Sequence, residues 1–120
     1  MSLEIGIRDI QGVSVVDVRG RITLGGGAGE LREALRIMTR EGHRKILLNL
    51  ADVTYMDSSG LGVLVAAFAT VTNQGGQVKL LHLTQRIMDL LLITKLLTVF
   101  EVFDDEAAAC RSFLQTAVAR

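Results

Sequence analysis

The sequence contains one cysteine, no proline, no tryptophan and few aromatic residues, which make up 4% of its 120 positions. The single cysteine, Cys110, excludes an internal disulfide and a metal site built from several cysteines. The 13 basic and 13 acidic residues leave no formal net charge, so the basic excess typical of nucleic-acid-binding proteins is missing. We therefore expect no direct contact with nucleic acid. Hydrophobic residues make up 49% of the chain, enough for an aliphatic core.

No segment has the pattern of a membrane span or of a secretion signal. The first residues, Met1 to Glu4, contain neither a basic region nor an apolar stretch. The longest run without a charged residue, 58–78, includes Asn73, Gln74 and glycines, and its apolar part is too short to cross a bilayer. We expect a cytoplasmic protein without a membrane partner, in which Cys110 stays reduced.

Apolar periodicity divides the chain into alternating strands and helices. Short apolar runs predict strands at 5–7, at 13–19 with a short extension to 23, and at 45–50, 77–83 and 99–103. Helical spacing predicts helices at 30–41, after Gly60, at 84–93 and after Asp104. This order predicts a single α/β domain over residues 1–120. Its sheet is expected to be mixed, mainly parallel, with four to five strands, an antiparallel hairpin and about four helices.

The last helix is expected to start at Asp104, which acts as its N-cap. Its apolar stripe consists of Ala107, Cys110, Leu114 and Ala117. On this interpretation Cys110 is a small core residue and not a reactive thiol.

The most distinctive stretch is 55–76, which follows the buried strand at 45–50. The residues after Gly60 have helical apolar spacing, so the segment Asp57-Ser58-Ser59-Gly60 lies at a strand-to-helix corner. Asp57 or a serine at such a corner can accept hydrogen bonds from the free N–H groups of the first helical turn. The positive end of the helix dipole can also host an anion such as a phosphate.

The helix after Gly60 lacks the charged face that a surface helix normally carries. Its core stripe comprises Leu61, Leu64, Val65, Phe68 and Val71. The opposite face comprises Val63, Ala66, Ala67 and Thr70. The pattern leaves two interpretations: this face is buried inside the protein, or it is kept apolar for a partner.

A glycine-rich segment, 25–29, precedes the first predicted helix. It lacks the Gly-Lys-Ser/Thr ending of a P-loop, so we expect a mobile loop and not a nucleotide site. Arg32, Arg36 and Arg40 follow at four-residue spacing. Such a row is typical of a solvated helix face, although it also suits an acidic partner. Gly42 is expected to end this helix.

An enzyme would use Ser58 or Ser59 as nucleophile, with His43 or His82 as base. A hydrolase of this fold class carries its serine in G-x-S-x-G, whereas the chain reads M-D-S-S-G and lacks the first glycine. Two isolated histidines and scattered carboxylates have no metal-ligand spacing, so we expect neither a metal nor a cofactor. Two interpretations of Ser58 then stay open. It is a modifiable serine on a recognition surface, or Ser58 and Ser59 only cap the helix.

The motif M-D-S-S-G-L-G, preceded by I-L-L-N-L-A-D-V-T-Y, resembles the signature of STAS domains, and more narrowly of bacterial anti-sigma-factor antagonists. The resemblance covers nearly the whole chain, including G-R-I-T, L-R-E-A-L and N-Q-G-G. It implies that a partner anti-sigma serine kinase phosphorylates the serine directly after the aspartate, which is Ser58. The unphosphorylated protein would bind the kinase and so free the sigma factor. Phosphorylation would release the kinase, and a serine phosphatase would reset the switch.

This chain departs from the family pattern at two places. The loop at 25–29 lacks the polar or acidic residues often found before the first helix, and Lys95 stands where the family often has glycine. The Lys95 departure is expected to alter only a helix end.

The resemblance assigns the role of Ser58, and the lack of charge on the helix that follows indicates a partner surface. Ser58 is the expected phosphate acceptor, and Asp57, Ser59 and Gly60 support the corner. The expected partner contacts are Gly62, Val63, Ala66, Ala67 and Thr70. Catalysis would belong to the partner kinase. The alternatives are a non-switching STAS scaffold or regulatory subunit in a signalling or transport complex, and a serine hydrolase.

Overall fold

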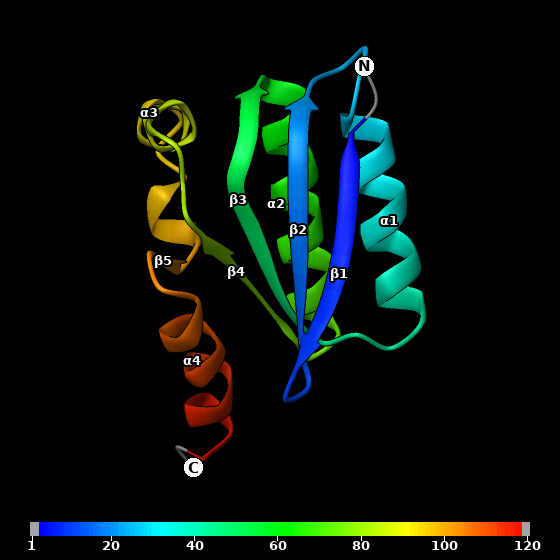
Figure 1. Ribbon diagram of the computed structural model, residues 1–120, viewed down its shortest axis with the longest axis vertical. Coiled ribbons are helices and arrows are strands. Elements are labelled where there is room, and N and C mark those ends of the chain that lie inside the picture. The colour runs from blue at the N-terminus through cyan, green and yellow to red at the C-terminus, as the bar shows by residue number, and fades with distance from the viewer. Residues whose placement is uncertain (1–2, 119–120) are drawn as a thin grey trace.

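The computed structural model describes residues 3–118, with side chains through residue 114. Five strands form one sheet in the order β1-β2-β3-β4-β5 (Figure 1). They are β1 Glu4–Ile10, β2 Val13–Ile22, β3 Lys45–Met56, β4 Gln77–Leu81 and β5 Val102–Phe103. The β1–β2 hairpin is antiparallel and every other pairing is parallel. The predicted α/β domain with a mixed, mainly parallel sheet is therefore confirmed.

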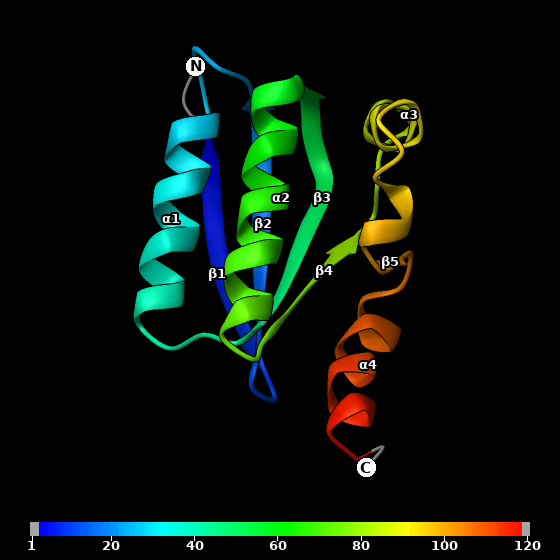
Figure 2. The same cartoon turned by 180° about the vertical axis from the view of Figure 1, so that it is seen from behind.

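Helices cover both faces of the sheet. They are α1 Ala28–Arg40, α2 Ser58–Asn73, α3 Gln85–Ile93, the short 3₁₀ helix η1 Leu97–Val99, and α4 Glu106–Val118. Helices α1 and α2 lie side by side on one face of the sheet (Figures 1 and 2). Residues Ile87 and Leu91 of α3 belong to the core on that side. Helix α4 covers the other side, where Cys110 and Phe113 belong to a buried cluster that includes Val15 and Leu47.

Strand β3 is longer than its apolar run predicted, because it continues past 50 to Met56. Its first residues, Lys45–Asn49, pair with β4. Beyond them the strand pairs with β2 alone, ending with Ile22 opposite Met56. Exposed residues such as Asp52 interrupt the apolar pattern there, because the extension has water on one side. The extension places the corner at 57–60 well beyond the end of β4.

Strand ends elsewhere also differ from the predicted bounds. Strand β4 stops at Leu81, because His82 adopts a positive φ of 59°. Residues Leu97–Val99 form a 3₁₀ turn, so β5 contains only Val102–Phe103. Helix α1 begins at Ala28 and not at residue 30. Apolar periodicity locates a helix or strand, but the residues at its ends also depend on the segments packed beside it.

The prediction for the last helix was wrong in its register. Asp105, not Asp104, accepts the N–H of Ala108 at 2.8 Å and caps α4. Ala107 is exposed, whereas Ala109 and Phe113 are buried; the side chain of Ala117 lies outside the described residues. Cys110 is buried as expected. Burial, reinforced by the nearby Glu106 carboxylate, raises the pKa of the Cys110 thiol, which disfavours the reactive thiolate.

Lys79 is a buried charged residue in β4. The predicted strand at 77–83 was identified from its apolar residues, which gave no indication that this lysine is buried. Its side chain is 3% exposed and lies beneath α4. The ammonium donates to Ser112 Oγ at 2.8 Å and lies 3.3 Å from the Glu101 carboxylate. It also lies 4.6 Å from the centroid of the Phe113 ring. The lysine therefore holds α4 against β4 through polar and cation–π contacts.

Candidate functional site

The corner between β3 and α2 is organised by Asp57. Its backbone is extended, and its side chain caps the helix. Oδ1 accepts the N–H groups of Ser59 at 2.9 Å and Gly60 at 3.1 Å. Oδ2 accepts the N–H of Leu24, in the loop after β2, at 3.1 Å. One carboxylate thus satisfies the start of the helix and ties it to a second loop.

These bonds set the charge state of Asp57. Desolvation by its surroundings raises the pKa of the carboxyl, but the backbone N–H groups of Leu24, Gly60 and Ser59 outweigh it and leave the pKa below its ordinary value. Hydrogen bonds to the charged form stabilise that form. Asp57 is therefore a carboxylate at neutral pH, one residue before Ser58.

Gly60 brings α2 close to the end of β2. A Cβ at this position would lie 2.5 Å from the carbonyl oxygen of Ile22 and 2.7 Å from Cγ of Met56. Only glycine fits that approach. At Gly62, in contrast, a Cβ would meet no atom within 4 Å, so this position faces open space.

The glycine-rich segment beside the corner is a hydrogen-bonded turn, not the mobile loop that its composition suggested. Thr23 N–H donates to Gly26 O at 2.8 Å, and Gly26 N–H donates back to Thr23 O at 3.1 Å. Gly27 has φ 98°, and a Cβ there would lie 1.9 Å from the carbonyl oxygen of Arg21. Gly27 therefore allows a tight turn against β2, and this turn presents the Leu24 N–H to Asp57.

Ser58 is the first residue of α2 and is exposed. Asp57 supplies the cap, so the interpretation in which the serines only cap the helix is wrong. Within the described part of the chain, the Ser58 hydroxyl forms no hydrogen bond. The half-buried Ser59 contributes its N–H to Asp57. Of the two serines, Ser58 is the more exposed to a second protein.

A shallow pocket adjoins Ser58, lined by Tyr55, Arg86, Asp89, Leu90 and Ile93. The guanidinium carbon of Arg86 lies 4.5 Å from the centroid of the Tyr55 ring. Arg21, opposite Tyr55 in the β2–β3 register, lies 4.8 Å from the same centroid. Sequence reasoning did not identify these arginines as site residues, because they lie far from Ser58 along the chain and only the fold brings the three elements together.

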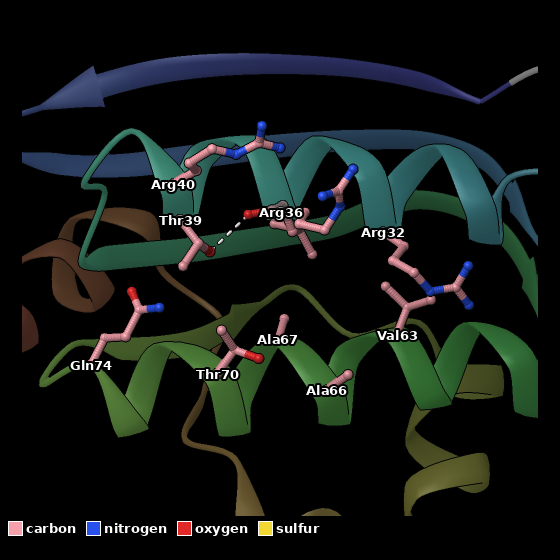
Figure 3. A pocket seen from close by; sticks show the side chains of 10 residues that line it. Arg32, Arg36, Thr39, Arg40, Val63, Ala66, Ala67, Thr70 and Gln74 are labelled. Carbon is pink, nitrogen blue, oxygen red and sulfur yellow. Dashed lines mark hydrogen bonds between the residues drawn. The ribbon is translucent and has the colours of Figure 1, made fainter.

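The expected partner face of α2 is divided between core and surface. Val63 is 3% exposed and belongs to the hydrophobic core, although it also lines the groove between α1 and α2. Ala67 is half-buried, and Gly62, Ala66 and Thr70 are exposed. Figure 3 shows Ala66, Ala67 and Thr70 pointing toward α1 along one wall of a groove. The uncharged face is therefore partly buried inside the protein and partly exposed to solvent.

Arginines from α1 form the other wall of that groove. Arg32, Arg36 and Arg40 line it and are exposed (Figure 3). Arg36 forms an ion pair with Glu33 on its own helix, with an N–O distance of 2.6 Å. The accessible surface of α2 is therefore bordered by positive charge, which would favour an acidic partner.

The structure brings neither histidine to Ser58. His43 Nδ1 lies 2.6 Å from Ser14 Oγ, at the opposite end of the sheet. His82 follows β4, which pairs with β3 only as far as Asn49. Met56 lies seven residues beyond Asn49, a distance of roughly 20 Å along a strand. The serine–histidine pair required by a hydrolase is therefore not assembled at the corner.

The described residues were also compared with the requirements of a metal site and of a membrane span. Among residues 3–118, no group of three or more histidine, cysteine, aspartate or glutamate side chains could hold a metal ion. In the same part of the chain, every helix is too short or too polar to cross a membrane.

Comparison with known proteins identifies the family to which this chain belongs. The model of the STAS domain matches residues 4–109. The chain belongs to the STAS domain family. It is 34% identical over 102 residues to the anti-sigma-B factor antagonist of Bacillus subtilis, which covers 85% of this chain and 92% of that protein. The resemblance to STAS-domain anti-sigma-factor antagonists, drawn from the motif at 56–62, is thereby confirmed.

Solved structures confirm the STAS fold. A candidate anti-sigma factor antagonist from Thermotoga maritima has a TM-score of 0.85 at 21% identity, covering 91% of this chain and 93% of that one. The phosphorylated form of the Bacillus cell fate determinant SpoIIAA has a TM-score of 0.72 at 16% identity, covering 91% and 98%. At these identities the similarity concerns the fold.

Proposed function

We propose that this STAS protein is an anti-sigma-factor antagonist controlled by phosphorylation of Ser58. When unphosphorylated, it binds an anti-sigma serine kinase and so releases a sigma factor for transcription. The kinase phosphorylates Ser58 and the complex dissociates, and a serine phosphatase restores the binding form. The observation that carries this proposal is the Ser58 hydroxyl, exposed at a helix start whose cap is supplied by Asp57.

The corner separates the modified group from the groups that maintain the fold. Asp57 and Gly60 perform the structural work, through three backbone hydrogen bonds and close contact with Ile22. Modification of Ser58 breaks none of these contacts. The protein can therefore alternate between two chemical states on one fold, and the start of a helix tolerates the added anion.

The effect of phosphorylation on binding is electrostatic. A phosphate adds about −1.5 to −2 charges at neutral pH, next to the Asp57 carboxylate and to the exposed part of α2. Bringing a partner onto this surface would then require desolvation of the phosphate, and acidic groups of the partner would be repelled. A loss of about 3 kcal/mol in binding free energy would lower affinity by roughly a hundredfold.

The accessible partner surface comprises Gly62, Ala66 and Thr70, with Ala67 at its edge. These small side chains would allow close approach by another backbone. Val63 is 3% exposed and would add little contact area.

Calorimetric titration against the anti-sigma serine kinases of the same organism tests the proposal. Four forms are compared: wild type, Ser58→Ala, Ser58→Asp and the protein phosphorylated at Ser58. The alanine variant should bind like wild type, the aspartate variant more weakly, and the phosphoprotein weakest, since aspartate carries one charge and fewer oxygens. Equal affinity of all four forms would favour a non-switching scaffold.

The modified residue is identified separately. The wild-type protein is incubated with each kinase and ATP, and the product is analysed by intact mass and phosphopeptide mapping. We expect one phosphate, on Ser58. Phosphate on Ser59 or on a threonine would contradict the assignment. The Ser58→Ala protein is the matched control and should gain no mass.

A further inference from the structure

We propose that Arg86 binds the phosphate carried by Ser58 and holds it on the surface of this protein. The inference rests on phosphorylation of Ser58, which is itself proposed above. It adds an intramolecular phosphate site, formed by an arginine of α3 that local sequence does not connect with the corner.

Arg86 and Ser58 line the same pocket. Arg86 lies in the first turn of α3, whose N-cap is Thr84. Its guanidinium lies over the ring of Tyr55, three residues before Ser58. Arg21 contacts the same ring from β2 but does not line the pocket. Arg86 is therefore the arginine placed to reach a group attached to Ser58.

In the part of the chain that the structure describes, the guanidinium of Arg86 has no anionic partner. Within residues 3–118, no carboxylate lies in ion-pair distance of Arg86, and its one assigned contact is with the Tyr55 ring. An exposed cation–π contact is weaker than paired charge-assisted hydrogen bonds from a guanidinium to a phosphate. A phosphate on Ser58 would therefore compete successfully with Tyr55 for Arg86.

Two carboxylates lie close enough to oppose the phosphate, and both are already engaged. Asp57 accepts three backbone N–H groups. Asp89, in the same pocket, accepts the side-chain amide of Gln85 at 2.8 Å. Arg86 would offset their repulsion. The phosphorylated protein would then keep its fold, and its corner would present a closed Ser58–Arg86 pair in place of a free hydroxyl.

The test uses protein with phosphoserine encoded genetically at position 58, so that no kinase is needed. Phosphorus NMR follows the second ionisation of the phosphate, which has a pKa of about 6 when unperturbed. A neighbouring cation lowers such a pKa. We expect the pKa of the phosphate in Arg86→Gln to lie about 0.5 above its value with Arg86 present. The matched control, Arg111→Gln, removes an exposed arginine from α4 on the other face and should change nothing.

A second readout reports on the arginine itself. The chain contains one tyrosine and no tryptophan, so its intrinsic fluorescence comes from Tyr55. Phosphorylation should change that emission in the wild-type background more than in Arg86→Gln, because only the former has an Arg86 contact to lose. Thermal unfolding of the unphosphorylated variants checks that they are folded, and Arg86→Lys, which keeps the charge without the two-pronged donor, should give an intermediate phosphate pKa.

An identical phosphate titration in wild type and Arg86→Gln would overturn the proposal. Weaker kinase binding by unphosphorylated Arg86→Gln, together with an unchanged titration, would assign Arg86 to the partner interface instead. The proposed function fails on a different result, namely no phosphorylation of wild-type protein by any kinase tested. The NMR result on encoded phosphoserine stands independently of that outcome.

Discussion

The carboxylate of Asp57 accepts a hydrogen bond from the backbone N–H of Leu24, 33 residues earlier in the chain, at 3.1 Å. The same side chain caps α2 through Ser59 and Gly60. The glycine turn after β2 and the strand-to-helix corner after β3 are therefore linked by one residue. Asp57 positions Ser58 by fixing the two backbone segments around it.

Replacing Asp57 by alanine should lower the free energy of unfolding by about 1–2 kcal/mol, because a helix cap and a loop contact are lost together. Chemical denaturation measures this directly. Asp57→Asn, which keeps an acceptor oxygen, should lose less. Equal stability of Asp57→Ala and wild type would show that water replaces the carboxylate without cost.

The contribution of Asp57 should depend on pH. Its pKa is lower in the folded protein than the ordinary value of about 3.9. The carboxylate therefore adds stability that is fully present above pH 3.9 and is lost as pH falls through the folded-state pKa. The stability difference between wild type and Asp57→Asn, measured by urea denaturation from pH 7 to pH 2.5, should shrink at the acidic end. A constant difference would contradict the assignment.

Two glycines in α2 form a matched pair. Gly60→Ala places a Cβ 2.5 Å from the Ile22 carbonyl oxygen and should cost about 2–3 kcal/mol of stability. Gly62→Ala meets no atom within 4 Å and should stabilise the helix by about 0.5–1 kcal/mol. The added methyl at position 62 should nevertheless weaken kinase binding if partners approach there. Thermal unfolding and calorimetry separate the two effects.

Val63 and Ala66 distinguish core from surface on the same helix. Val63→Lys puts a charge at a position that is 3% exposed and should destabilise the fold by roughly 2–4 kcal/mol. Ala66→Lys changes an exposed residue and should leave the melting temperature near that of wild type while weakening kinase binding. A stable Val63→Lys protein would contradict the burial of Val63, and unimpaired binding by Ala66→Lys would exclude that residue from the interface.

Helices α1, α2 and α3 end in the same hydrogen-bonding motif, with one residue in the left-handed region. That residue is Gly42 in α1 and Gly75 in α2, but Lys95 in α3, at φ 63°. Lys95→Gly should therefore raise the free energy of unfolding by about 0.5–1 kcal/mol, since left-handed backbone is costly for a side chain. Gly42→Lys, the reverse change at the equivalent position, should lower it. An opposite sign in either variant would show that side-chain contacts outweigh backbone preference.

The element order and the corner could be predicted from the sequence because their signals are local. Helical spacing, a capping aspartate and a glycine after each of two helices act over a few residues of the same segment. The motif at 56–62 also pointed to the family and to Ser58. The Lys95 departure was located correctly at a helix end, where its positive φ explains why glycine suits that position.

Only the tertiary structure decided which side chains of those segments are accessible to solvent and which of them are in contact. Val63 and Ala66 lie on one uncharged face, and the packing of α1 buries the first and leaves the second exposed. Lys79 lies in an otherwise apolar strand, and only the packing of α4, which brings Ser112 and Phe113 to the ammonium, accounts for its burial. The Tyr55–Arg86 contact joins residues of β3 and α3, and no local propensity encodes it. The burial of a side chain and its contacts with distant residues depend on how separate elements pack together. Helices, strands and caps depend mainly on neighbours along the chain.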